Sequence, residues 1–145
     1  MRVTFPRLPD HERAWALVER DDGVVYRLYG GTAGPRLPHD VMHLVVEREL
    51  RIKDGIWAGI AAGDPSHSPG LRAELLADLV SSAATLDTMT LDKIKRLAAA
   101  KLSVLPDADV DPVVIAAAAR ALQVEAARWA RLRVGEELSY DWPGR

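Results

Sequence analysis

The sequence has no cysteine, no long apolar run and no large excess of charge of either sign. Without cysteine the chain has no disulfides, no thiolate metal ligands and no cysteine nucleophile. No apolar stretch approaches the roughly 20 residues that a membrane-spanning helix needs. The first fifteen residues also lack the apolar centre of a signal peptide. We therefore expect a cytoplasmic protein with no membrane partner.

The charge balance excludes a general attraction to nucleic acid or anionic lipid. Nineteen lysines and arginines face 21 aspartates and glutamates, for a formal net charge of -2. The sequence shows no clear basic patch for nucleic acid either. Its 48% hydrophobic and 28% charged residues are ordinary for a soluble globular protein. With 145 residues it predicts one domain, spanning 1–145.

Residues 1–30 predict a β-rich start. A short strand is expected over Arg2 to Phe5, and two further stretches, RAWALVER and VVYRLY, flank Asp21-Asp22-Gly23. That tripeptide predicts a hairpin turn, because glycine tolerates the positive φ that such turns require. The segment 30–38 holds three glycines and two prolines and is expected to be a connector.

Residues 38–132 predict a helical middle. The first helix is expected to begin at Pro38 and to end near Gly55, which would supply a left-handed C-terminal cap. Shorter helices are expected over 56–62, 71–84 and 91–102. Asp111-Pro112 predicts the start of a last helix running to about Leu132. Its expected inward face consists of Ile115, Ala118, Leu122, Ala126 and Trp129.

The end of the chain alternates apolar and polar residues over 137–142, which predicts a terminal strand with one buried face. We expect this strand to pair with the N-terminal sheet. The fold class is therefore α+β, in which a small antiparallel sheet, made of the N-terminal hairpin and the C-terminal strand, packs against four or five helices.

Three segments, LPHDVMHLVVEREL, DGIWAGIAAG and VGEELSYDWP, resemble a group of small uncharacterised proteins of high-GC bacteria. In that group a β-rich start, an LPHD-x-x-H helix, a glycine-punctuated continuation and a tryptophan-containing terminal strand follow in the same order. The resemblance covers most of the chain and implies this order of elements. It implies no established activity, cofactor or partner.

The first helix carries the most specific chemical pattern. His39, His43 and Glu47 are spaced at i, i+4 and i+8, so they share one slowly drifting stripe. Two imidazoles at i and i+4 can bind one divalent ion, as in the helix of zinc proteases. Glu47 is a candidate third ligand or a hydrogen-bond acceptor for His43. Nitrogen and oxygen ligands suit Zn²⁺, Ni²⁺, Fe²⁺ or Mn²⁺.

The pattern is half of a complete motif. Asp40 stands where a zinc protease has glutamate, and its shorter side chain reaches less far toward a metal-bound water. His67 and His11, both in expected loops, are alternative third ligands. The alternative interpretation is a buried helix whose histidines have only a structural role.

Two functions follow from this sequence. The first is a non-catalytic binding or interaction module with a protein partner or a second copy of itself, in which the histidines are structural. The second is a divalent-metal protein, such as a hydrolase, in which His39, His43 and Glu47 hold the ion and Asp40 or Glu47 activates water. Whether the chain is an enzyme stays open at this point.

Overall fold

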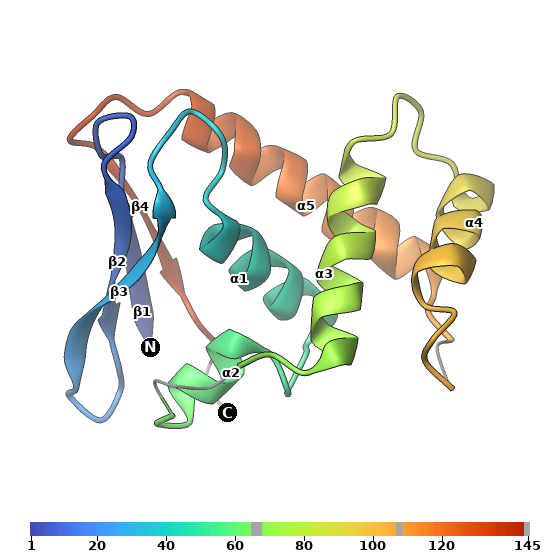
Figure 1. Ribbon diagram of the computed structural model, residues 1–145, viewed down its shortest axis with the longest axis horizontal. Coiled ribbons are helices and arrows are strands. Elements are labelled where there is room, and N and C mark those ends of the chain that lie inside the picture. Colours follow the sequence, from blue (N-terminus) through green and yellow to red (C-terminus); the bar gives the residue numbers. More distant parts are fainter. Residues whose placement is uncertain (65–67, 107–108, 144–145) are drawn as a thin grey trace.

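The computed structural model describes residues 1–64, 68–106 and 109–143 as four strands and five helices (Figure 1). The strands are β1 (Arg2–Pro6), β2 (Arg13–Glu19), β3 (Val25–Thr32) and β4 (Glu137–Asp141). The helices are α1 (His39–Leu50), α2 (Ile56–Ala61), α3 (Leu71–Ala84), α4 (Leu91–Lys101) and α5 (Pro112–Ala130). The predicted α+β class is confirmed.

The strands form one antiparallel sheet in the order β3-β2-β1-β4. The hairpin between β2 and β3 turns at Gly23, whose φ of 87° lies in the region that glycine favours. β4 returns from the far end of the chain to pair with β1, so that Val3 lies opposite Tyr140. The predicted pairing of the two ends of the chain is confirmed.

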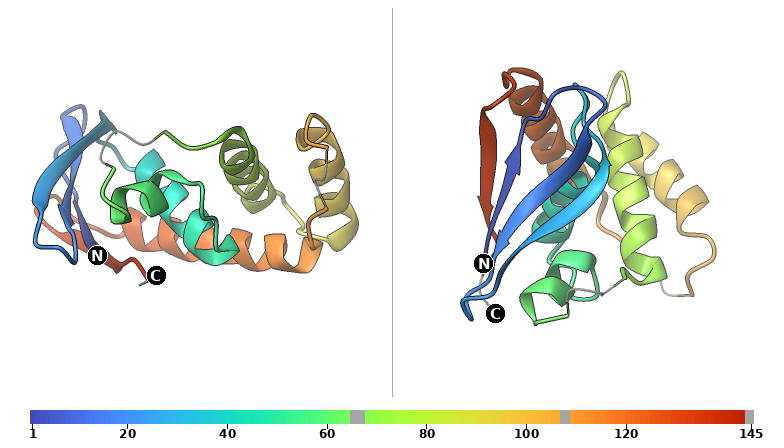
Figure 2. Two further views of the ribbon diagram at one scale, coloured as in Figure 1. Left: turned by 90° about the horizontal axis from the view of Figure 1, so that it is seen from below. Right: turned by 60° about the vertical axis from the view of Figure 1, so that its left-hand side comes forward.

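α1 is the central helix. Figures 1 and 2 show it between the sheet and α3, with α5 running alongside and α4 farthest from the sheet. Val41, Leu44, Val45 and Val46 are fully buried, because neighbours surround this helix on most sides. Its side chains therefore form the middle of the hydrophobic core.

α5 differs from the prediction in one respect. Four of the five expected inward positions are buried, but Ala126 is exposed and its neighbour Glu125 is buried. Position 125 lies three residues after Leu122 and four before Trp129, so it faces inward on the same helical stripe. The hydroxyl of Tyr140 donates to Glu125 at 2.5 Å, which satisfies the buried carboxylate. Burial and this hydrogen bond raise the pKa of Tyr140 above its ordinary value.

Within the described part of the chain, no helix is both long enough and apolar enough to cross a membrane.

Candidate functional site

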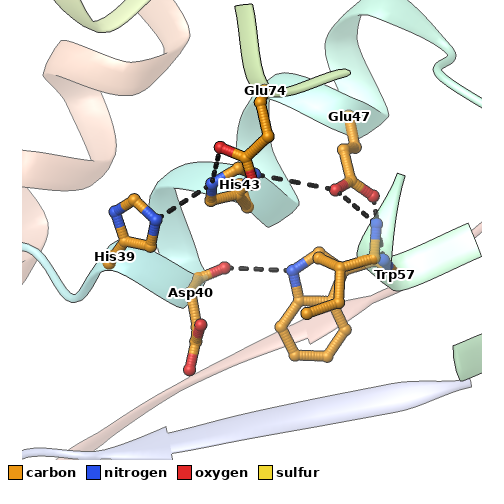
Figure 3. A network of polar contacts seen from close by, with 7 residues as sticks. His39, Asp40, His43, Glu47, Trp57 and Glu74 are labelled. Carbon is orange, nitrogen blue, oxygen red and sulfur yellow. Dashed lines mark hydrogen bonds and ion pairs between the residues drawn. The ribbon is translucent and has the colours of Figure 1, made fainter. Parts of the chain in front are cut away.

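The candidate site lies along one side of α1 and is drawn in Figure 3. Pro38 precedes the helix with φ -57° and ψ 142°, an extended conformation that allows the next residue to begin the helix. His39 is exposed at this end, whereas His43 is 3% exposed one turn further in. The helix thus runs from the surface at His39 into the core.

The two histidines meet as their i, i+4 spacing predicts. Their Nε2 atoms lie 3.0 Å apart, so one ring donates a hydrogen bond and the other accepts it. Glu74 of α3 approaches from the other side, with Oε2 3.7 Å from Nε2 of His43 (Figure 3). The side chain of Glu74 is 48% exposed, so this group of three opens to solvent.

The other ring nitrogen of His43 faces inward. Its Nδ1 is buried, has no hydrogen-bond partner among the described residues and lies 3.8 Å from Oε1 of Glu47. This distance is too long for a hydrogen bond but permits a charge interaction. Burial alone would lower the pKa of His43, but the carboxylates of Glu47 and Glu74 outweigh it and leave that pKa above its ordinary value.

Glu47 serves mainly as an acceptor for the start of α2. Its two carboxylate oxygens accept hydrogen bonds from the backbone N–H groups of Ile56 and Trp57, each at 2.9 Å. Because an N-terminal helical turn leaves its N–H groups without intrahelical partners, a carboxylate at this place satisfies them. Glu47 is only 1% exposed and is therefore a structural cap between two helices.

The turn between α1 and α2 differs from the sequence prediction. Gly55 was expected to form a left-handed C-terminal cap of the first helix, but that conformation belongs to Arg51, with φ 51°. Gly55 instead precedes α2 with φ -84°. A Cβ atom at Gly55 would lie 2.2 Å from Cδ of Glu47. Glycine is needed here for close approach of the carboxylate, because no space remains for a side chain.

Asp40 points away from the two imidazoles (Figure 3). Its backbone carbonyl accepts a hydrogen bond from Nε1 of Trp57 at 3.0 Å. Hydrogen bonds therefore join α2 to α1 at two places, Asp40 and Glu47. Its carboxylate accepts no hydrogen bond from the described residues. Burial raises the pKa of this carboxyl, and the charges of His39 and His43 lower it in part.

A hollow of about 390 Å³, here called the loop hollow, lies beside Asp40. The connector 30–38 forms its rim, and Asp40 and His39 contribute polar groups. Trp129 lines it too and donates from Nε1 to the carbonyl of Gly34 at 3.1 Å, which holds the connector in place. The remaining aromatic lining consists of Phe5 and Trp15. A mostly apolar hollow with a few polar groups has the character of a small-molecule site.

A second hollow, of about 1270 Å³, lies by the β2–β3 turn and the end of α1. It carries charges of both signs, some of which pair with one another. The N-terminal amine binds Asp21 at 2.6 Å, and the guanidinium of Arg20 bonds Asp22.

A ready metal site is not present in the described ranges, where no group of three or more histidine, aspartate or glutamate side chains is arranged to hold an ion. Two imidazole nitrogens about 2.1 Å from one tetrahedral ion would lie roughly 3.4 Å apart. The Nε2 atoms of His39 and His43 are closer than that, at 3.0 Å. Of the alternative third ligands, His67 lies outside the described residues. His11 is exposed on the β1–β2 turn, and its side chain makes no hydrogen bond to either histidine.

Three features of the site were missed by sequence reasoning. Glu74 lies 31 positions after His43 in the chain, Trp57 bonds Asp40 through its ring nitrogen, and the connector joins Trp129 to form the loop hollow. Each depends on a contact between distant segments. A local pattern carries no signal for such contacts.

Comparison with known proteins adds no further identification. No family model, no curated protein and no solved structure matches this chain. The resemblance to the high-GC bacterial group therefore stays a prediction, as do the expected location and self-association.

Proposed function

We propose that this protein is a non-catalytic binding module, and that the loop hollow is where its ligand binds. The observation that carries this proposal is a partly buried carboxylate, Asp40, which lines the hollow and accepts no hydrogen bond from the described residues. Burying such a group without a donor is unfavourable unless a partner supplies one. A ligand that donates to Asp40 would remove that cost.

The lining defines the chemical class of the ligand. Trp15 is partly exposed and offers aromatic surface for an apolar or aromatic body, and the buried rings of Phe5 and Trp129 complete the apolar lining. Asp40 offers a carboxylate for a cationic or N–H donor group, and a positive charge over an aromatic face is additionally favourable. The volume of about 390 Å³ suits a small molecule rather than a macromolecule. We therefore assign the hollow to small aromatic amines.

The test uses two matched pairs of probes, phenethylamine with 2-phenylethanol and tryptamine with tryptophol. Binding is followed through the four indole N–H signals in two-dimensional NMR. We expect the amines to shift the signals of Trp15 and Trp129 and to leave that of Trp142, which lies at the other hollow. Each amine should bind about tenfold more tightly than its alcohol, because only the amine pairs with the carboxylate.

Asp40→Asn is the decisive variant and Asp92→Asn, at an exposed position on α4, is its control. We expect Asp40→Asn to abolish the preference for amines and Asp92→Asn to retain it. Equal binding of amine and alcohol to the unchanged protein contradicts the proposal, as does an absence of shifts at millimolar probe.

A further inference from the structure

The pair of histidines and Glu74 lie on the side of α1 away from the Asp40 carboxylate (Figure 3). We propose that His39, His43 and Glu74 capture one divalent transition-metal ion, and that Glu47 acts as a positioning residue behind His43. His39 also lines the loop hollow, but His43 and Glu74 do not, and metal capture does not depend on the amine-binding function.

The first argument is the convergence of three donor atoms. The Nε2 atoms of His39 and His43 lie 3.0 Å apart and share a hydrogen bond, whose proton a bound ion would displace, and Oε2 of Glu74 lies 3.7 Å from Nε2 of His43. Separating the nitrogens by a few tenths of an ångström gives the spacing of ligands on a common ion. His39 is exposed on the first residue of its helix, and the side chain of Glu74 is half exposed, so both can make this small adjustment.

The second argument is the orientation of His43. Its Nδ1 is buried and makes no hydrogen bond within the described part of the chain, and the carboxylate of Glu47 lies 3.8 Å from it. A proton on Nδ1 therefore faces a negative charge and leaves the lone pair of Nε2 directed at His39. Histidines that bind metal have this arrangement, with the second nitrogen directed at a carboxylate that fixes the tautomer.

The third argument is charge. Glu47 and Glu74 flank two imidazoles that are neutral when they bind metal, so the group carries two negative charges. A divalent cation balances them. Two nitrogens and one oxygen favour zinc or nickel over magnesium, which prefers oxygen ligands. Water fills the remaining positions, because the group is open to solvent.

The test is calorimetric titration of EDTA-treated, dialysed full-length protein with zinc, nickel or magnesium chloride at pH 7.5. We expect one zinc or nickel ion per chain and no heat with magnesium. Cobalt(II) provides a separate readout, since binding to nitrogen ligands changes its visible absorption. His39→Ala should weaken zinc binding at least about tenfold, and Glu74→Gln by about tenfold, as expected for the loss of a ligand.

The matched control is His11→Ala, which removes another exposed histidine, from a different turn, and should leave affinity unchanged. Both test residues are exposed, so their variants should fold, and circular dichroism checks this. The proposal is overturned if the protein binds no stoichiometric zinc or nickel, or if His39→Ala binds as tightly as the unchanged protein. It is also overturned if the histidines take up protons on acidification but metal never competes with those protons.

Discussion

The two ends of α1 each hold a carboxylate in an enclosed position, and the protein treats them in opposite ways. Glu47 is 1% exposed and receives two backbone N–H groups, both at 2.9 Å. Asp40 is partly buried and receives none from the described residues, and burial raises its pKa. The negative charge of Glu47 is matched by the two N–H donors of α2.

This difference separates a structural carboxylate from one that is available to a ligand. A buried charge costs free energy unless hydrogen bonds compensate it. At Glu47 the compensation comes from the chain itself, and the result is a fixed junction between α1 and α2. At Asp40 it must come from outside the chain. The comparison predicts that changes at the Glu47 end reduce stability, whereas changes at the Asp40 end mainly alter binding.

The largest effect is expected from Glu47→Ala. This change leaves two buried N–H groups at the start of α2 without an acceptor, so we expect the free energy of unfolding to fall by about 3 to 5 kcal/mol. Urea-induced unfolding at pH 7 measures it. If that variant does not fold, Glu47→Gln retains one acceptor and should cost about 2 kcal/mol. Glu49→Ala, at an exposed position on the same helix, is the control and should change stability by less than about 0.5 kcal/mol. Equal losses of stability at positions 47 and 49 would contradict the structural role of the Glu47 carboxylate.

A smaller effect is expected from alanine at the glycine beside each carboxylate. A Cβ at Gly55 would lie 2.2 Å from Cδ of Glu47, which cannot move without losing two hydrogen bonds. We expect Gly55→Ala to cost about 2 to 3 kcal/mol. A Cβ at Gly30 would lie 2.7 Å from Oδ2 of Asp40, a carboxylate that breaks no bond when it rotates. Gly30→Ala should therefore cost about 1 kcal/mol or less while it displaces Asp40 and weakens binding of the amine probes.

Gly31→Ala is the control for both glycine changes, because a Cβ at Gly31 meets nothing within 4 Å. Thermal and urea unfolding of the three variants rank their costs. We expect the loss of stability to be largest for Gly55→Ala, smaller for Gly30→Ala and smallest for Gly31→Ala. A larger loss at Gly30 than at Gly55 would show that Asp40 is held as firmly as Glu47.

The sequence was informative where structure is local. The spacing of His39 and His43 predicted that their side chains share one face, and their Nε2 atoms do meet. The same spacing placed Glu47 on that stripe, but it could not show that the N–H groups of α2 would bind this carboxylate. That contact depends on the tight turn through Arg51, which no propensity predicts, because a left-handed arginine is uncommon.

Contacts between distant segments could not be predicted from the sequence for the same reason. Glu74 belongs to α3, and its distance from His43 is set by how two helices pack. The predicted inward face of the last helix contained Ala126 and not Glu125, because the partner that satisfies Glu125, Tyr140, comes from β4. Polar residues inside the core are predictable only when their partners are known.

The smallest effect, and the most specific, is expected from Asp40→Asn. Because burial raises the pKa of Asp40 in the folded protein, the folded state still holds this proton at a pH where the unfolded chain has lost it. The stability of the unchanged protein should therefore fall, relative to Asp40→Asn, as the pH rises from the ordinary aspartate value near 3.8 through the raised folded value. At pH 7 the variant should be more stable by up to about 1 kcal/mol, since it no longer buries an uncompensated charge. Urea unfolding of both proteins at intervals from pH 3.5 to 7, with Asp92→Asn as control, gives the difference directly. A difference that is flat with pH, or that favours the unchanged protein at pH 7, would mean that Asp40 is compensated like Glu47 and that the loop hollow has no free carboxylate to offer.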